Sequence, residues 1–103
     1  MDILQRLFKS VSGKTRIEIL LLLLDREELS VSDIASELDI KMSTISRNLS
    51  ILEKDNFVKA RYMSSNVFYS IKEDTRYKYN HGILNILRTR LEENQNCDKF
   101  HIS

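Results

Sequence analysis

The chain has 103 residues, of which 42% are hydrophobic and 30% charged, with a formal net charge of +1. This length suits one domain with a modest core, so we expect a single domain over residues 1–103. One cysteine (Cys97) excludes an intrachain disulfide framework, and two histidines without a glycine-rich loop leave no catalytic constellation. The composition therefore argues against an enzyme.

The longest apolar run, from Ile19 to Leu24, is far shorter than the roughly 20 residues that cross a bilayer. The N-terminus also lacks the basic-then-apolar pattern of a secretion signal. A single cysteine is typical of a reducing compartment. We expect a cytoplasmic protein with no membrane partner.

Two helices are predicted at the start of the chain. Apolar residues recur at three- and four-residue steps over residues 3–11, which indicates a short amphipathic helix ending near Ser12 and Gly13. Residues 14–25 are apolar nearly all round, which is typical of a helix buried on both sides.

A helix-turn-helix is predicted next. Ser30 and Asp33 have the spacing of a capping box and begin a short helix ending at Leu38. A turn of about three residues, 39–41, leads into a second helix over residues 41–54. Two start positions are possible for that helix, because either Lys41 or Ser43 can be its N-cap.

The second of these helices has two different faces. Ile45, Leu49 and Leu52 form an apolar stripe. The opposite face carries short hydroxyls and two cations, without a carboxylate. Such side chains bond phosphate oxygens and base edges and let a helix enter the major groove, although an ordinary solvated face has the same composition.

The rest of the chain predicts a hairpin and a last helix. Residues 57–62 and 67–71 are rich in β-branched and aromatic residues and flank a turn in which Asn66 tolerates the left-handed conformation. Residues 74–93 follow a helical period, with Gly82 either weakening the helix or marking a close helix approach. The fold class expected is mainly α with a small β-hairpin, in the order α-α-α-α-β-β-α.

Charge is unevenly distributed along the chain. Residues 25–39 hold six acids and one base, whereas residues 41–61 hold five bases and two acids. The positive field is therefore local to the second helix of the pair and the hairpin, which carries Lys59 and Arg61 on one face. The expected contacts to double-stranded DNA are Lys41, Met42, Ser43, Thr44, Ser46, Arg47, Ser50, Lys54, Lys59, Arg61, Ser64, Ser65 and Asn66.

These segments together resemble the ArsR/SmtB-type winged helix-turn-helix transcription repressors. The resemblance runs over roughly residues 7–72 and rests on four segments: 8–20, 29–35, 43–52 and the hairpin as the wing. It implies a homodimer that reads a palindromic operator and is controlled by an effector, which is unknown here. The terminal helices, 2–11 and 74–93, are the expected dimer interface, through Ile3, Leu4, Leu7, Phe8, Ile83, Leu84, Leu87 and Leu91.

The chain departs from the metal sites of the resembled family. Where thiophilic-metal sensors have Glu-Leu-Cys-Val-Cys-Asp, residues 28–33 have serines, which are poor ligands for soft ions. Other members of the family bind metal through a pattern of ligands on the last helix. If its first histidine is set on His81, the remaining ligand positions fall on Tyr79, Glu92 and Gln95, so at most two plausible ligands are left. No metal or cofactor is expected, and Cys97 and His101 are left without a role.

Two functions remain open from the residues. The first is a sequence-specific DNA-binding regulator, most simply a repressor. The alternative is a winged-helix module for protein contacts without specific DNA binding, which the near-neutral total charge favours.

Overall fold

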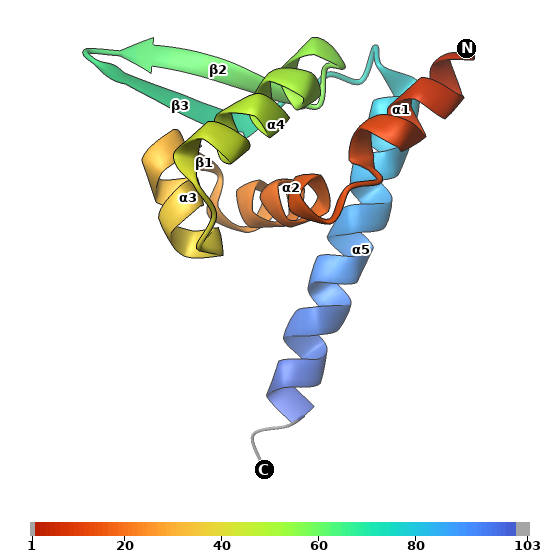
Figure 1. Ribbon diagram of the computed structural model, residues 1–103. Helices are drawn as coiled ribbons and strands as arrows, with labels where there is room; N and C mark the ends of the chain where they lie inside the picture. Colours follow the sequence, from red (N-terminus) through yellow and green to blue (C-terminus); the bar gives the residue numbers. More distant parts are fainter. Residues whose placement is uncertain (1, 101–103) are drawn as a thin grey trace.

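The computed structural model describes residues 2–100, with side chains described through residue 95. Within this part of the chain there are five helices and a three-stranded antiparallel sheet, whose long hairpin projects away from the first and last helices (Figure 1). The elements are α1 (Ile3–Val11), α2 (Lys14–Arg26), β1 (Glu28–Ser30), α3 (Val31–Leu38), α4 (Met42–Lys54), β2 (Val58–Met63), β3 (Asn66–Ile71) and α5 (Lys78–Phe100). The winged helix-turn-helix expected from the sequence is confirmed.

The sheet has one strand more than the sequence predicts. β1 pairs with β3, which also pairs with β2, so the strand order is β1-β3-β2. β1 is only three residues long, too short for an alternating hydrophobic pattern to reveal it. The strand ties the hairpin directly to the start of α3.

Local chemistry fixes both ends of α3. The Ser30 side chain accepts a hydrogen bond from the Asp33 backbone N–H at 3.1 Å, which confirms the predicted N-cap. Asp39 ends the helix with φ 54°, and its N–H bonds the carbonyls of Ala35 and Ser36. This left-handed residue closes α3 and turns the chain into α4.

Of the two N-caps that the sequence allows for α4, the structure has Lys41, with Met42 as the first helical residue. The hairpin turn differs from the prediction. Ser64, with φ 56°, takes the left-handed conformation, while Asn66 begins β3 in extended geometry. Asn66 is not the left-handed residue because the turn is a two-residue one, Ser64–Ser65, which places Asn66 opposite Met63 in the ladder.

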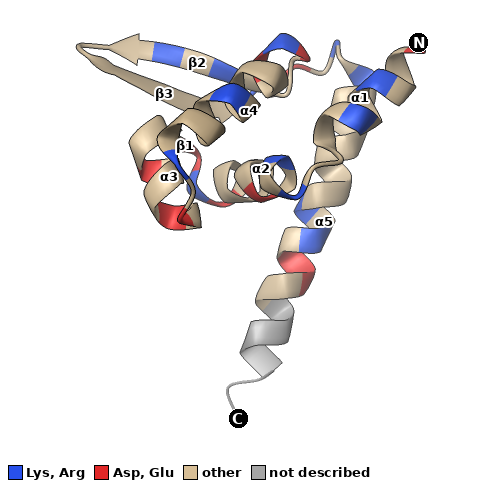
Figure 2. Ribbon diagram, in the orientation of Figure 1, with Lys and Arg blue, Asp and Glu red and all other residues tan. Residues whose placement is uncertain are grey.

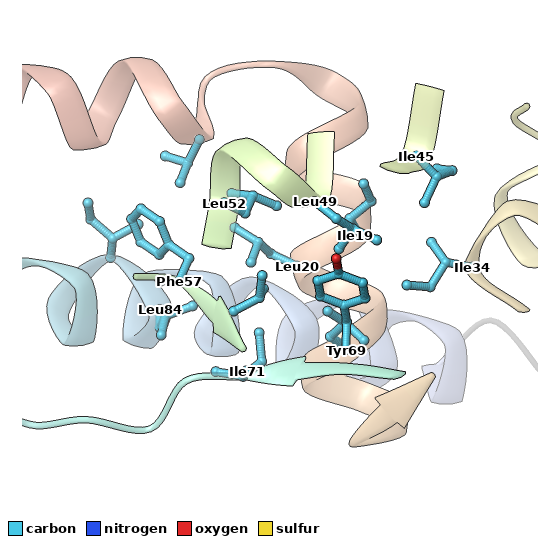
Figure 3. Packing of buried hydrophobic residues seen from close by; sticks show 14 of the residues in the cluster. Ile19, Leu20, Ile34, Ile45, Leu49, Leu52, Phe57, Tyr69, Ile71 and Leu84 are labelled. Carbon is cyan, nitrogen blue, oxygen red and sulfur yellow. The ribbon is translucent and has the colours of Figure 1, made fainter. Parts of the chain in front are cut away.

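The core lies between α2, α4, the sheet and the start of α5 (Figure 3). Ile19 and Leu20 of α2 and the stripe Ile45, Leu49 and Leu52 of α4 are fully buried. Leu7, Ile83 and Leu84 also belong to this core. The apolar stripe predicted for α4 therefore fixes which side of that helix faces outward.

Gly82 lies on an exposed part of α5. A Cβ built there meets nothing within 4 Å among the described residues. Among the described residues, Gly82 does not mark a close helix approach on its own side of α5, so it is an ordinary exposed helical glycine. None of the described helices is both long and apolar enough to cross a membrane.

Candidate DNA-binding surface

The outward side of α4 presents the side chains that the sequence predicts. Met42 is 53% exposed. The other exposed positions on the helix are polar, and Thr44 is half-buried at the edge of this side. The acidic residue on α4 is Glu53, next to the last residue of the helix. The exposed members of the predicted set on this segment are Lys41, Met42, Ser43, Ser46, Arg47, Ser50 and Lys54.

A groove of about 410 Å³ separates the start of α4 from the wing. Its walls come from three segments: the start of α3, the start of α4 and the hairpin turn. It is lined by hydroxyl, amide and apolar groups: Ser30, Val31, Ser32, Met42, Ser43, Ser46, Ser65, Asn66 and Val67. The predicted wing-turn residues Ser65 and Asn66 are thus brought beside the predicted helix residues Ser43 and Ser46.

The two cations of the wing have different surroundings. Lys59 and Arg61 are both exposed on β2. Arg61 reaches across the middle strand over the Phe68 ring, with 5.4 Å from its guanidinium carbon to the ring centroid. Its Nη2 and Nε donate to the two carboxylate oxygens of Glu28 on β1, at 2.6 and 3.0 Å. The positive charge of Arg61 is therefore already neutralised within the protein.

This ion pair is also reflected in the acid–base properties of its members. The hydrogen bonds from Arg61 hold the pKa of the Glu28 carboxyl below its ordinary value, and Glu28 raises the pKa of Arg61. The sequence offered no signal for the pair, because the two residues are 33 positions apart and β1 was not predicted. Lys59 is left as the wing cation without a described ion pair.

The sequence analysis missed an apolar part of the wing. Tyr62 is 76% exposed and Met63 is 49% exposed, next to the predicted turn residues Ser64 and Ser65. Strand alternation places Tyr62 on the face opposite Arg61. No sequence signal identified Tyr62 as exposed, because alternation places it on the same face as Val58 and Ala60, and only the structure shows that the core side of β2 ends at Ala60.

Charges are segregated over the surface in the manner expected. Figure 2 shows Lys and Arg along α4 and β2 and acidic residues on α3. Two acids of the segment 25–39 are partly balanced, because Arg26 lies 3.4 Å from Asp25 and 3.1 Å from Glu37. The positive charge on the α4 and β2 side is therefore local, on a chain with a net charge of +1.

The expected dimer surface needs a correction. Leu7, Ile83 and Leu84 are only 2%, 7% and 2% exposed within a single chain, so they pack its own core and cannot form a contact surface. Leu4, Leu87 and Leu91 are half-buried. Helical periodicity identified the apolar side of each terminal helix but could not show that the core already covers part of it.

Other apolar side chains on the terminal helices are open to solvent. Ile3 and Phe8 on α1 are 51% and 50% exposed. On α5, Tyr79 and Ile86 are 52% and 64% exposed, and both were missed by the sequence analysis. Ile3 and Tyr79 line the same hollow, of about 370 Å³, where α1 crosses the start of α5 (Figure 1).

The described residues show no group of three or more His, Cys, Asp or Glu side chains close enough to hold a metal ion. Ser30 and Ser32, at the positions of the family's cysteines, are 3.1 Å apart through their Oγ atoms, and Ser30 caps α3. His81 is half-buried on α5. The side chain of Cys97 and all of His101 lie outside the described residues.

Comparisons with known proteins agree with this architecture. The family model for bacterial regulatory proteins of the arsR family matches residues 13–60. The transcriptional activator HlyU of Vibrio cholerae is 37% identical over 65 residues, which cover 63% of this chain and 59% of that protein. The chain thus matches less than two thirds of that relative's length. An HTH-type transcriptional regulator, MJ1325 of Methanocaldococcus jannaschii, is 40% identical over 66% of this chain and 76% of that protein.

A third relative is the transcriptional repressor SmtB homologue of Synechocystis, 31% identical over 88% of this chain and 63% of its own. Among solved structures, reduced HlyU from Vibrio cholerae superposes with a TM-score of 0.68 and 30% identity, covering 82% of this chain and 83% of that one. The chain therefore belongs to the arsR family of bacterial regulatory proteins, and its fold is the winged helix-turn-helix of that family.

Proposed function

We propose that the chain is a homodimeric regulator of transcription that reads a palindromic operator, with α4 in the major groove and the wing on the backbone or in the minor groove. The observation that carries this proposal is the outward side of α4. It presents Arg47 and a row of hydroxyls on a helix whose other side is fully buried. Arg47 matches a guanine edge through two parallel hydrogen bonds, and the small serines allow the helix backbone to approach the bases.

Operator recognition can be tested with a sequence obtained by selection from random duplexes. Arg47→Ala should weaken binding to the selected operator by about 1–3 kcal/mol and relax discrimination at one base position. Lys54→Ala, at the end of the same helix, is the matched control. Its contact is expected to be with phosphate, so it should weaken binding to operator and scrambled DNA alike. An equal, small loss on both DNAs for Arg47→Ala would exclude a base-reading role.

Dimerisation is supported by the apolar residues that remain exposed on the terminal helices. Ile3 and Phe8 on α1 and Tyr79 and Ile86 on α5 are at least half exposed. Tyr79 and Ile86 are seven residues apart and so share one side of α5. A two-fold contact between copies would cover these side chains and set the distance between the two α4 helices, which should be about 34 Å to fit successive major grooves.

Sedimentation velocity tests this arrangement. Ile86→Glu places a charge on the proposed contact and should shift the protein toward monomer. Ser36→Glu adds the same charge on α3, away from the terminal helices, and should leave the dimer intact. If neither substitution changes the sedimentation coefficient of a dimeric wild type, the terminal helices do not form the interface.

We further propose that the regulator represses, because a dimer that only occupies an operator can act by excluding the transcription machinery. The named relatives include both an activator and a repressor, so similarity does not decide the direction. A reporter gene placed behind the selected operator measures it: repression predicts higher expression for Arg47→Ala than for wild type. Lower expression for the variant would mean activation.

The alternative is a winged helix used for protein contacts. The net charge of +1 and the acidic segment 25–39 favour it. A gel shift with random-sequence duplex at low salt separates the two functions, because a protein-contact module should give no salt-dependent shift.

A further inference from the structure

Arg16 connects α1 to α4 through two hydrogen bonds. It lies on α2, is half-buried and donates in two directions. Its Nη1 is 3.0 Å from the carbonyl oxygen of Ser10, in the last turn of α1. Its Nε is 2.9 Å from Oδ1 of Asn48, in the middle of α4. One side chain thus bridges a terminal helix and the helix with the predicted base contacts.

The bridge continues inside α4. Because a guanidinium has donors only, the amide oxygen of Asn48 must face Arg16, which leaves the NH₂ group free to donate elsewhere. That group donates to the carbonyl oxygen of Thr44 at 2.8 Å. Asn48 is adjacent to Arg47, and Thr44 is itself one of the predicted DNA contacts. The chain of hydrogen bonds therefore ends within the reading surface.

The two hydrogen bonds of Arg16 restrict the position of α4 in a way that the apolar stripe cannot. The burial of Ile45, Leu49 and Leu52 holds α4 against the core, but hydrophobic contact is non-directional and tolerates small rotations or shifts of a helix. Two bonds in fixed directions from one planar guanidinium define where Asn48 lies relative to the end of α1. A base contact is lost when the helix that carries it is misplaced by about 1 Å.

We propose that Arg16 is a positioning residue for sequence reading: it sets the position and rotation of α4 relative to α1 and so aligns Arg47 with its base. This inference rests on the proposed function. It adds a residue on α2, a helix that holds none of the predicted DNA contacts. It also gives a physical connection from the proposed dimer interface to α4, through the carbonyl of Ser10.

The test uses the full chain and a selected operator. Arg16→Lys keeps the positive charge and most of the stem but loses the forked geometry. Binding to the operator should weaken about tenfold, the size expected for losing a charge-assisted hydrogen bond, while binding to random-sequence duplex changes little. Arg26→Lys is the matched control, because Arg26 is also on α2 but pairs with Glu37 instead of α4. It should leave both affinities unchanged.

Two further measurements distinguish positioning from mere stabilisation. In a double-mutant cycle, Asn48→Ala should cost much less in the Arg16→Lys background than in the wild type, because the two substitutions remove one shared bond. The Arg16 Nε–H signal in ¹H–¹⁵N spectra should be protected from solvent exchange in wild type and lose that protection in Asn48→Ala. Alanine favours the helix, so this variant should fold even if Arg16→Lys does not.

The outcomes are distinct. A selective loss on the operator with a non-additive cycle supports the positioning role. Equal losses on operator and random DNA, an additive cycle, or an effect no larger than that of Arg26→Lys overturns it and leaves the proposed function standing. If wild type does not prefer any sequence over random duplex, the proposed function fails together with this inference.

Discussion

The ion pair between Glu28 and Arg61 predicts that removing an acid will strengthen DNA binding. In the unbound protein both carboxylate oxygens of Glu28 accept from Arg61, at 2.6 and 3.0 Å. Glu28→Gln removes the negative charge and leaves one neutral acceptor oxygen in place of two charged ones. The guanidinium of Arg61 is then available to phosphate on the exposed side of the wing.

The size of the effect follows from counterion release. Each new phosphate contact steepens the slope of log affinity against log salt by about 0.9, so a dimer with two wings should gain about 1.8. Between about 50 and 200 mM salt, the variant should therefore lose about 12-fold more affinity than wild type. Arg61→Ala in the wild-type background should change the slope little, whereas Lys59→Ala should flatten it.

Fluorescence anisotropy with a labelled random-sequence duplex over a salt series measures these slopes. Glu27→Gln is the matched control, since it removes the same charge one residue away without touching Arg61. The double variant Glu28→Gln with Arg61→Ala should return the slope to the wild-type value. The reasoning is refuted if Glu28→Gln and Glu27→Gln steepen the slope equally, because the effect would then be one of net charge alone.

Three predictions concern the stability and titration of the protein. Asn80 is 5% exposed, and its Nδ2 donates to the Asp55 carbonyl at 2.7 Å. Asn80→Ala should therefore lower the free energy of unfolding, measured in urea, by about 1–3 kcal/mol. No loss would show that this bond does not anchor the end of α4. A Cβ at Gly82 meets nothing within 4 Å, so Gly82→Ala should raise that free energy by about 0.5–1 kcal/mol, and a decrease would reveal a surface packed against it. Hydrogen bonds from Arg76 lower the pKa of Asp74 from 3.8 to about 2. The ionised Asp74 therefore contributes its full share to the free energy of unfolding at pH values above 3.8, and this contribution is lost as the pH falls through about 2. An NMR titration should find this low pKa and its return toward 3.8 in Arg76→Ala; an unchanged pKa in that variant would assign the shift to another cause.

Elements with strong local signals could be predicted from the sequence. Ser30 and Asp33 define the start of α3 because a capping bond joins residues three positions apart. The stripe Ile45, Leu49 and Leu52 determines which side of α4 is buried, and hence that Arg47 faces outward. The order of helices and hairpin, and the family resemblance built on it, follow from the same short-range patterns.

Features that depend on residues distant in sequence required the tertiary structure. Periodicity marks Leu7, Ile83 and Leu84 as apolar, but only packing shows that the chain's own core covers them and leaves Ile3, Phe8 and Ile86 open. The reason is that a pattern records which side of a helix avoids water and not which partner covers it.

The same limit applies to polar contacts. Arg61 and Glu28 meet across β3, and Arg16 meets Asn48 across 32 positions of sequence. A sequence gives the charge and length of each side chain, whereas the choice of partner depends on where the folded backbone places both ends. The amino-acid sequence thus determined α4 and its outward side, and tertiary contacts decided that Arg61 is paired with Glu28 and that Arg16 bridges α1 and α4.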